Sequence, residues 1–181
     1  MTILDIIKTG GVILYPSDTL WGLGGDATQD KPALRIRQIK GREADKPFIV
    51  LVSDLDMLRS LVGEIPPAVM NEMEKSIRPL TVIYPRGYGV SAHVKAADGS
   101  LAVRVVKKGF ARDLIRVVNR PLISTSANLS GQPAPASFEE IPEDILRSVD
   151  YVVNLHRSKT GARPSRIIRF DEQGRIQVIR E

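Results

Sequence analysis

The chain has 181 residues, 43% of them hydrophobic, and a net charge of +5. This length fits one domain, residues 1–181, that can bury most of its apolar surface. The chain has no cysteine, which excludes disulfides and cysteine-bound metals, and two histidines are too few for most histidine-rich metal sites. No apolar run approaches the roughly 20 residues of a membrane span, and no secretory leader precedes the first helix, so we expect a cytoplasmic protein without membrane contact.

The N-terminal segment predicts a helix, a strand and a loop. Residues 3–7 place apolar side chains on one helical face, and Gly10 and Gly11 end that helix. Residues 12–15 predict a buried strand that Pro16 breaks. The loop that follows, residues 17–25, is rich in glycine and carries hydroxyls, a carboxylate and the only tryptophan. A loop of this kind directly after a strand is more often functional than filler.

Helices and strands alternate along the rest of the chain. Further helices are expected over 30–41 with Asp30 as cap, 53–61 with Ser53 and Asp56 as a capping pair, 66–77 with Ile77 facing inward, 110–118, and 137–149 with a capping box at 137–140. Further strands are expected over 48–52, 80–84, 101–106, the apolar start of 121–135, 151–155, and a terminal hairpin of 166–170 and 175–180. This alternation of strands and helices indicates an α/β fold: a single-domain twisted mixed β-sheet flanked by helices.

Three short motifs are judged to be chance matches. The run at 22–27 has the glycines of a dinucleotide fingerprint, but Pro16 to Leu20 separate it from its strand, which argues against a Rossmann site. The triplet at 159–161 lacks the S-x-x-K partner of a β-lactamase. The glycosylation acceptor at 128–130 has no secretory signal beside it. The chain also has no P-loop, so any ATP binds without one.

Two segments predict a binding site for an anion. The stretch 121–135, PLISTSANLSGQPAP, follows a strand with residues small enough to bring backbone and hydroxyls against a ligand. At the end of a predicted helix, Lys40 and Arg42 can reach one polyphosphate, and Lys46 joins them if its loop folds back. From the residues alone, a basic surface turn partly offset by acids and an ordinary polar turn stay open as alternatives.

Six segments resemble one known family. PSDTLWGLG, KGREADKPFIVLV, PLTVIYP, LAVRV, PLISTSANLSGQPAP and PSRII occur in the order and approximate spacing of the YrdC-like threonylcarbamoyl-AMP synthases. The resemblance covers about residues 10–180 and is to the short, single-domain form. The paired signature of this family, Lys-x-Arg with Ser-x-Asn, is Lys40, Arg42, Ser126 and Asn128 here.

The resemblance implies a reaction of L-threonine, bicarbonate and ATP that gives threonylcarbamoyl-AMP and pyrophosphate. Downstream proteins would transfer the product to tRNA, forming threonylcarbamoyladenosine. The implied catalytic residues are Lys40, Arg42, Ser126 and Asn128. The implied ATP contacts are Lys40, Arg42, Lys46, Thr81, Ser100, Ser126, Asn128 and Arg180, and the implied threonine contacts are Thr19, Arg104, Ser124 and Ser165. Mg²⁺ is expected on the phosphates, with no metal-binding protein side chain identified.

The implied chemistry does not demand a protein nucleophile. Threonine's amine captures bicarbonate or carbon dioxide as a carbamate, whose oxygen attacks the α-phosphorus while pyrophosphate leaves. Positioning and nearby cations can supply the catalysis. The polar segment 156–164 is a candidate lid over the labile intermediate. We expect Ser124 to face threonine and Ser126 with Asn128 to face the nucleotide, separated by strand alternation if the strand continues that far and by backbone turns if it does not.

Two departures from the family pattern concern substrate binding. The family's Trp-Pro-Gly is Ser76-Ile77-Arg78 here, and Leu51 stands where some members place a threonine-contacting histidine. An alternative of another class is a non-enzymatic module that binds tRNA or double-stranded RNA, which the pI of about 9.6 favours. Only 5% of the residues are aromatic, which argues against base stacking. A paralogue with another activity would generally lose one of the signature pairs, and this chain keeps both.

Overall fold

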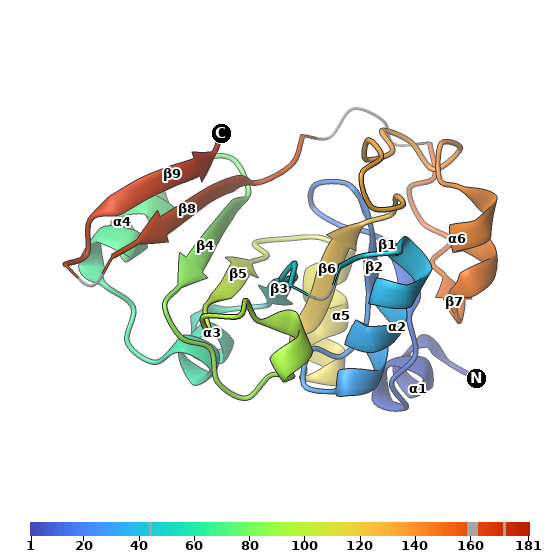
Figure 1. Ribbon diagram of the computed structural model, residues 1–181, viewed down its shortest axis with the longest axis horizontal. Helices are drawn as coiled ribbons and strands as arrows, with labels where there is room; N and C mark the ends of the chain where they lie inside the picture. The colour runs from blue at the N-terminus through green and yellow to red at the C-terminus, as the bar shows by residue number, and fades with distance from the viewer. Residues whose placement is uncertain (44, 159–162, 172) are drawn as a thin grey trace.

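The computed structural model describes residues 1–43, 45–158, 163–171 and 173–181. Nine strands in these residues form one mixed sheet of order β7-β1-β2-β6-β3-β5-β4-β8-β9 (Figure 1). The strands are β1 (Ile13–Pro16), β2 (Trp21–Gly24), β3 (Ile49–Val52), β4 (Leu80–Tyr84), β5 (Leu101–Val105), β6 (Leu122–Ser126), β7 (Tyr151–Val152), β8 (Arg166–Phe170) and β9 (Ile176–Arg180). The pairs β1–β7, β3–β5 and β4–β8 are parallel and the other neighbours antiparallel, which confirms the prediction of a mixed α/β sheet.

Helices cover both faces of this sheet. They are α1 (Ile3–Lys8), α2 (Asp30–Lys40), α3 (Leu55–Val62), α4 (Pro67–Lys75), α5 (Phe110–Val118), α6 (Glu143–Ser148) and the short 3₁₀ helix η1 (Ala92–Val94). Because successive strand residues point to opposite faces, Leu14 of β1 joins the core beneath α2 and α6, whereas Ile13 and Tyr15 join the core beneath α1 and α5. Burial on both faces explains why β1 is apolar without alternation.

The end of α2 makes Lys40 and Arg42 point in different directions. Gly41 adopts a left-handed conformation, with φ of 58° and ψ of 37°, which ends the helix directly after Lys40. The Arg42 amide then donates to the Arg37 carbonyl at 2.9 Å. Lys40 therefore stays on the helix, facing the sheet, while Arg42 begins the loop that leads to β3.

The prediction of a loop over residues 17–25 is wrong in its second half. Residues 21–24 form β2, which is buried throughout and pairs with both β1 and β6. Gly24 lets these strands lie close together, because a Cβ there would come within 2.5 Å of the Ile123 carbonyl oxygen. The same glycines that indicated a loop thus permit a tightly packed strand.

Several predicted boundaries also need correction. Helix α6 starts after Pro142, and the Glu140 carboxylate accepts from the Ala136 amide within a loop instead of capping a helix. Asp54, not Ser53, caps α3 through its bond to the Met57 amide, and Gln29 precedes α2 in place of Asp30. The predicted strand 151–155 shortens to two residues. Ile77, predicted to face inward, is fully exposed.

None of the helices in the described part of the chain is long and apolar enough to cross a membrane.

Candidate active site

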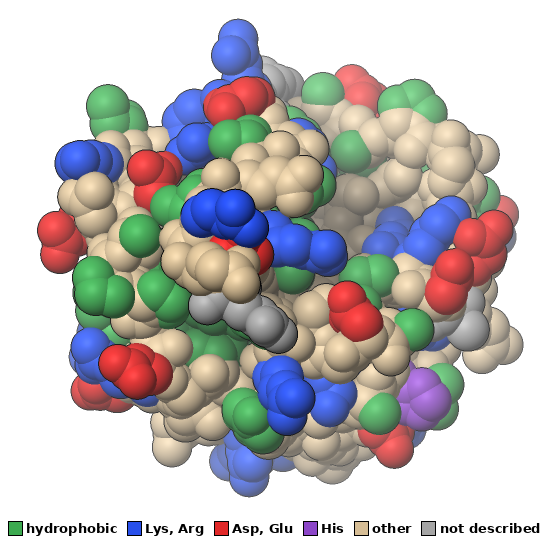
Figure 2. All heavy atoms as spheres, turned by 60° about the vertical axis from the view of Figure 1, so that its left-hand side comes forward, with side chains coloured by type: hydrophobic (Ala, Val, Ile, Leu, Met, Phe, Trp, Pro, Cys, Tyr) green, Lys and Arg blue, Asp and Glu red, His purple; other side chains and the backbone are tan. Residues whose placement is uncertain are grey.

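A cavity of about 360 Å³ lies over one face of the sheet, where β6, β3, β5, β4, β8 and β9 each contribute a side chain. This is the face that α1 and α5 cover elsewhere, since Ile49 and Leu51 of β3 belong to their core. The loop between β1 and β2 and the loop after α2 complete its walls. Figure 2 shows a hollow in the molecular surface with lysine and arginine side chains along its edge.

The structure brings most of the expected site residues to this cavity. Those that line it are Thr19, Arg42, Arg104, Ser124, Ser126, Ser165 and Arg180. Those that do not are Lys40, Lys46, Thr81, Ser100 and Asn128. The lining set comes from six separate strands or loops, so the fold assembles it from residues far apart in the chain.

The two signature motifs meet through Lys40. Its side chain is 2% exposed, and its Nζ donates to the carbonyl oxygens of Ser126 and Asn128, each at 2.5 Å. The Ser126 hydroxyl donates to the Asn128 Oδ1 at 2.5 Å, and the Ser130 amide donates to the Lys40 carbonyl at 2.8 Å. Burial, and secondly the neighbouring charge of Arg42, lower the pKa of Lys40 to about 8. Lys40 thus ties the end of β6 to α2 from behind the cavity wall.

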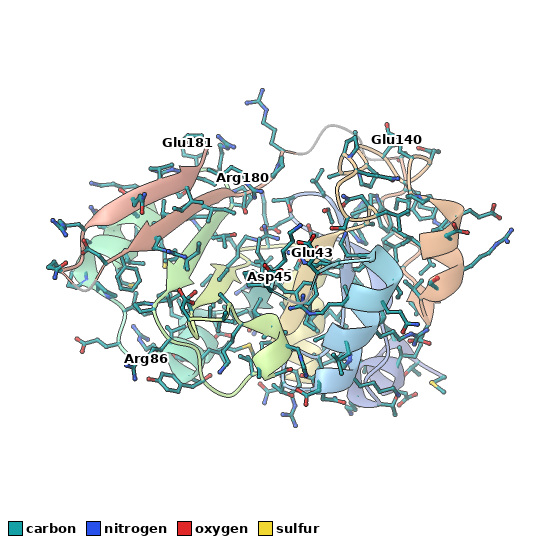
Figure 3. The ribbon with its side chains drawn as sticks, in the orientation of Figure 1. Glu43, Asp45, Arg86, Glu140, Arg180 and Glu181 are labelled. Atoms are coloured by element: carbon teal, nitrogen blue, oxygen red, sulfur yellow. The ribbon has the colours of Figure 1, made fainter. Side chains whose placement is uncertain are left out.

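Unlike Lys40, Arg42 lines the cavity itself. Its guanidinium donates to the Pro47 carbonyl at 2.7 Å and lies 5.0 Å from the centre of the Phe48 ring. Burial and the charge of Arg37 lower the pKa of Arg42. Lys46 instead pairs with Glu43 at 2.9 Å in the half-exposed part of the loop. Figure 3 shows Glu43 on this loop, after α2.

A buried ion pair stands farther along the sheet, since Arg104 lies opposite Leu51 of β3 whereas Arg42 packs on Phe48 before this strand. Arg104 is 3% exposed, and its Nη2 lies 3.0 Å from Oδ1 of Asp18 in the β1–β2 loop. The Arg104 Nε is also buried and has no hydrogen-bond partner among the described residues. Asp18 has no expected role from the sequence alone, since only the fold brings its carboxylate to Arg104. Beside it, the Thr19 hydroxyl lies 3.0 Å from that of Ser17.

Arg180 and Ser165 form the wall next to Arg104. The Arg180 Nε and Nη2 both donate to the Ser165 carbonyl, at 3.0 and 2.8 Å. Burial, and then the charge of Arg104, lower the pKa of Arg180. Thr81 is fully buried behind this wall, with its hydroxyl 2.8 Å from that of Ser165. Figure 3 shows Arg180 at the end of β9.

The strand β6 continues through Ser126, but alternation does not separate its serines. Ser124 and Ser126 are two residues apart, so they share a face, and both line the same cavity. The turn after Ser126 places Asn128 outside the cavity lining. Ser100 lies outside the cavity, where its amide donates to Asp98 at 2.9 Å. Leu51 is fully buried in the core. Of the candidate lid 156–164, residues 159–162 lie outside the described residues, and Pro164 lines the cavity.

The arrangement favours small anionic ligands. Three arginines face one cavity among hydroxyl groups, and the buried Arg104 keeps an unused donor. Within the described residues, no group of three or more His, Cys, Asp and Glu side chains could hold a metal ion. The fold and this site define an α/β protein with a cavity whose arginine and serine side chains can hold anionic groups.

The chain belongs to the Sua5/YciO/YrdC family, whose model, described as "Telomere recombination", matches residues 5–181. Threonylcarbamoyl-AMP synthase of Xanthomonas euvesicatoria pv. vesicatoria is 36% identical over 159 residues, which cover 86% of this chain and 83% of that relative. The protein of the same name from Dichelobacter nodosus is 32% identical, with coverage of 96% and 90%.

Solved structures of Pyrococcus abyssi Sua5 are similar in fold. The complex with L-threonine has a TM-score of 0.85 and 27% identity, and it covers 98% of this chain and 52% of that one. The Pyrococcus abyssi threonylcarbamoyl-AMP synthase is 31% identical over 86% of this chain and 46% of its own length. The chain thus spans about half the length of these archaeal relatives. Escherichia coli YciO, at 24% identity and a TM-score of 0.83, shares the fold.

Proposed function

We propose that this protein is an L-threonylcarbamoyladenylate synthase, which forms threonylcarbamoyl-AMP, pyrophosphate and water from L-threonine, bicarbonate and ATP. The observation that carries the proposal is the single cavity that Arg42 enters at one end and the buried Arg104 at the other. Two separated cationic ends suit two anionic substrates that must react with each other. Membership of the family and the names of the matched relatives support this activity over a non-enzymatic RNA-binding module.

In the proposed complex, Arg104 holds the threonine carboxylate. Its buried, unpartnered Nε gains an acceptor when a carboxylate binds, which removes the cost of an unsatisfied buried donor. The hydroxyls of Thr19, Ser124 and Ser165 line the same end and can bond the threonine hydroxyl and amine. This end of the cavity therefore orients the amine toward the middle of the cavity.

The nucleotide takes the end near Arg42, with its phosphates beside Arg42 and extending toward Arg180, which stands next to Arg104. Ser126 also faces the cavity there. The carbamate oxygen attacks the α-phosphorus, and the arginine charges stabilise the pyrophosphate that leaves. Mg²⁺ would enter with the ATP phosphates and neutralise part of their charge; no protein side chain is assigned to it. Lys46, Thr81, Ser100 and Asn128 point elsewhere, so ATP contacts at these residues require local rearrangement.

Lys40 acts in this proposal through the residues it holds. Its ammonium fixes the carbonyls of Ser126 and Asn128, which shapes the turn after β6 beside the nucleotide. The product would then pass to proteins that transfer the threonylcarbamoyl group to tRNA. A filter-binding assay tests whether this protein itself binds tRNA.

The test measures pyrophosphate release from ATP with each amino acid in turn, in the presence and absence of bicarbonate. We expect release to require bicarbonate and to be fastest with L-threonine. Mass spectrometry should identify threonylcarbamoyl-AMP as the product. Equal release with all amino acids, or none with threonine, contradicts the proposal. Salt-sensitive tRNA binding without ATP binding would favour the RNA-binding alternative instead.

A further inference from the structure

We propose that Asp18 is a positioning residue that orients the Arg104 guanidinium for the substrate carboxylate, an inference that rests on the proposed function. The two side chains approach to 3.0 Å, and they are only 3% and 16% exposed. Among the described residues, this is the salt bridge with the most deeply buried arginine. Arg104 lines the cavity, and Asp18 lies directly behind it, between two residues that also line the cavity.

The loop that carries Asp18 is held rigidly. The Ser17 hydroxyl donates to the Leu20 carbonyl at 2.7 Å and accepts from the Thr19 amide at 3.1 Å. Ser17 and Thr19 both line the cavity, whereas Asp18 between them borders a second, mostly apolar cavity of about 480 Å³. The Asp18 carboxylate therefore stands in the wall between the two cavities, fixed by its neighbours on both sides.

The contact uses one part of the guanidinium and leaves another free. Asp18 lies against Nη2, while the Nε of Arg104 has no hydrogen-bond partner among the described residues. The Asp18 Oδ1 itself lacks a well-directed hydrogen bond, so the pair is mainly electrostatic. An arginine that is held at one nitrogen and keeps an unpaired donor at another favours one orientation of a bound carboxylate.

The charges around the pair give Asp18 a second effect. Arg180 lies close enough to Arg104 that their mutual repulsion lowers the pKa of Arg180. Asp18 offsets part of the positive charge at this end of the cavity. Without it, Arg104 would turn toward other acceptors, such as ATP phosphates. Asp18 therefore favours recognition of an α-carboxylate over nonspecific attraction of anions.

The experiment compares L-threonine with L-threoninamide, which lacks the carboxylate, in the wild type and in Asp18→Asn. The isosteric change removes the charge without opening a cavity. We expect kcat/KM for threonine to fall by about tenfold or more, the preference for threonine over its amide to fall by a similar factor, and KM for ATP to change by less than about twofold. Asp18→Glu should restore part of the preference.

The matched control is Asp150→Asn, which breaks the ion pair of Asp150 with Arg35 away from the cavity. It should lower the melting temperature without changing the preference for threonine. An unchanged preference in Asp18→Asn, or an equal loss for both substrates, overturns the inference. If Asp18→Asn does not fold, the partial preference of Asp18→Glu decides. If the wild type is inactive with threonine, the proposed function fails, whereas calorimetric binding of threonine and its amide still tests Asp18.

Discussion

The buried Lys40 predicts a pH dependence of stability that Lys40→Met should abolish. Its pKa falls from 10.5 in an exposed lysine to about 8 in the folded protein, first because of burial and then because of Arg42. Between these two values the unfolded chain binds a proton that the folded chain has released. Stability therefore rises with pH through this window, and the cost of burying the charge is fully present only below about pH 8.

The size of the effect follows from the same two values. At about 1.4 kcal/mol per pKa unit, the wild type should gain about 2 to 3 kcal/mol between pH 7 and 10 relative to Lys40→Met. The variant also leaves the carbonyls of Ser126 and Asn128 without their donor, at a cost of roughly 1 to 3 kcal/mol each that does not depend on pH. The change with pH in the difference between the two unfolding free energies reports the titration of Lys40, whereas the pH-independent part reports the lost hydrogen bonds.

The assay is urea unfolding at several pH values for the wild type, Lys40→Met and Lys8→Met, an exposed lysine on α1. At each pH, the free energy of unfolding of the wild type is subtracted from that of the variant. The contributions of all titrating groups other than the substituted lysine then cancel. We expect the difference for Lys40→Met to change with pH and that for Lys8→Met to stay nearly constant. A difference for Lys40→Met that varies by less than about 0.5 kcal/mol over this range would show that burial does not depress its pKa.

Two further substitutions test the sheet and the site. Gly24→Ala should destabilise the protein by more than about 3 kcal/mol in urea unfolding, because its Cβ would meet the Ile123 carbonyl, whereas Gly131→Ala, strained only by its φ of 84°, should cost about 1 kcal/mol. Similar costs would contradict the close approach of β2 and β6. Arg42→Ala should abolish threonine-dependent pyrophosphate release with little change in melting temperature, whereas Arg86→Ala, at an exposed arginine, should leave release intact.

The sequence was sufficient to predict a mixed α/β sheet and to place the two signature motifs at one site. Apolar runs mark most of the strands, but the direct bonds from Lys40 to the carbonyls of Ser126 and Asn128 were not predicted, because the expected partner of Lys40 was a ligand. Ligand contacts at these residues remain predictions. The strand β2 was missed because its glycines serve close packing, which a local pattern cannot distinguish from a loop. Asp18 was missed for a different reason, since its partner lies 86 positions away in the chain and only the register of the sheet joins them.

The strand β6 joins two halves of the sheet by short ladders. Its residues 122–124 pair with β3, and its residues 125 and 126 pair with β2. Thr19 reaches the cavity from the β2 half, whereas Arg104 and Arg180 reach it from the β3 half. Substrates that contact residues from both halves would hold the two halves of the sheet together at β6. At a hundred times its dissociation constant, such a ligand adds about 2.7 kcal/mol to the stability of the folded state, so the occupied enzyme should resist unfolding more than the empty one.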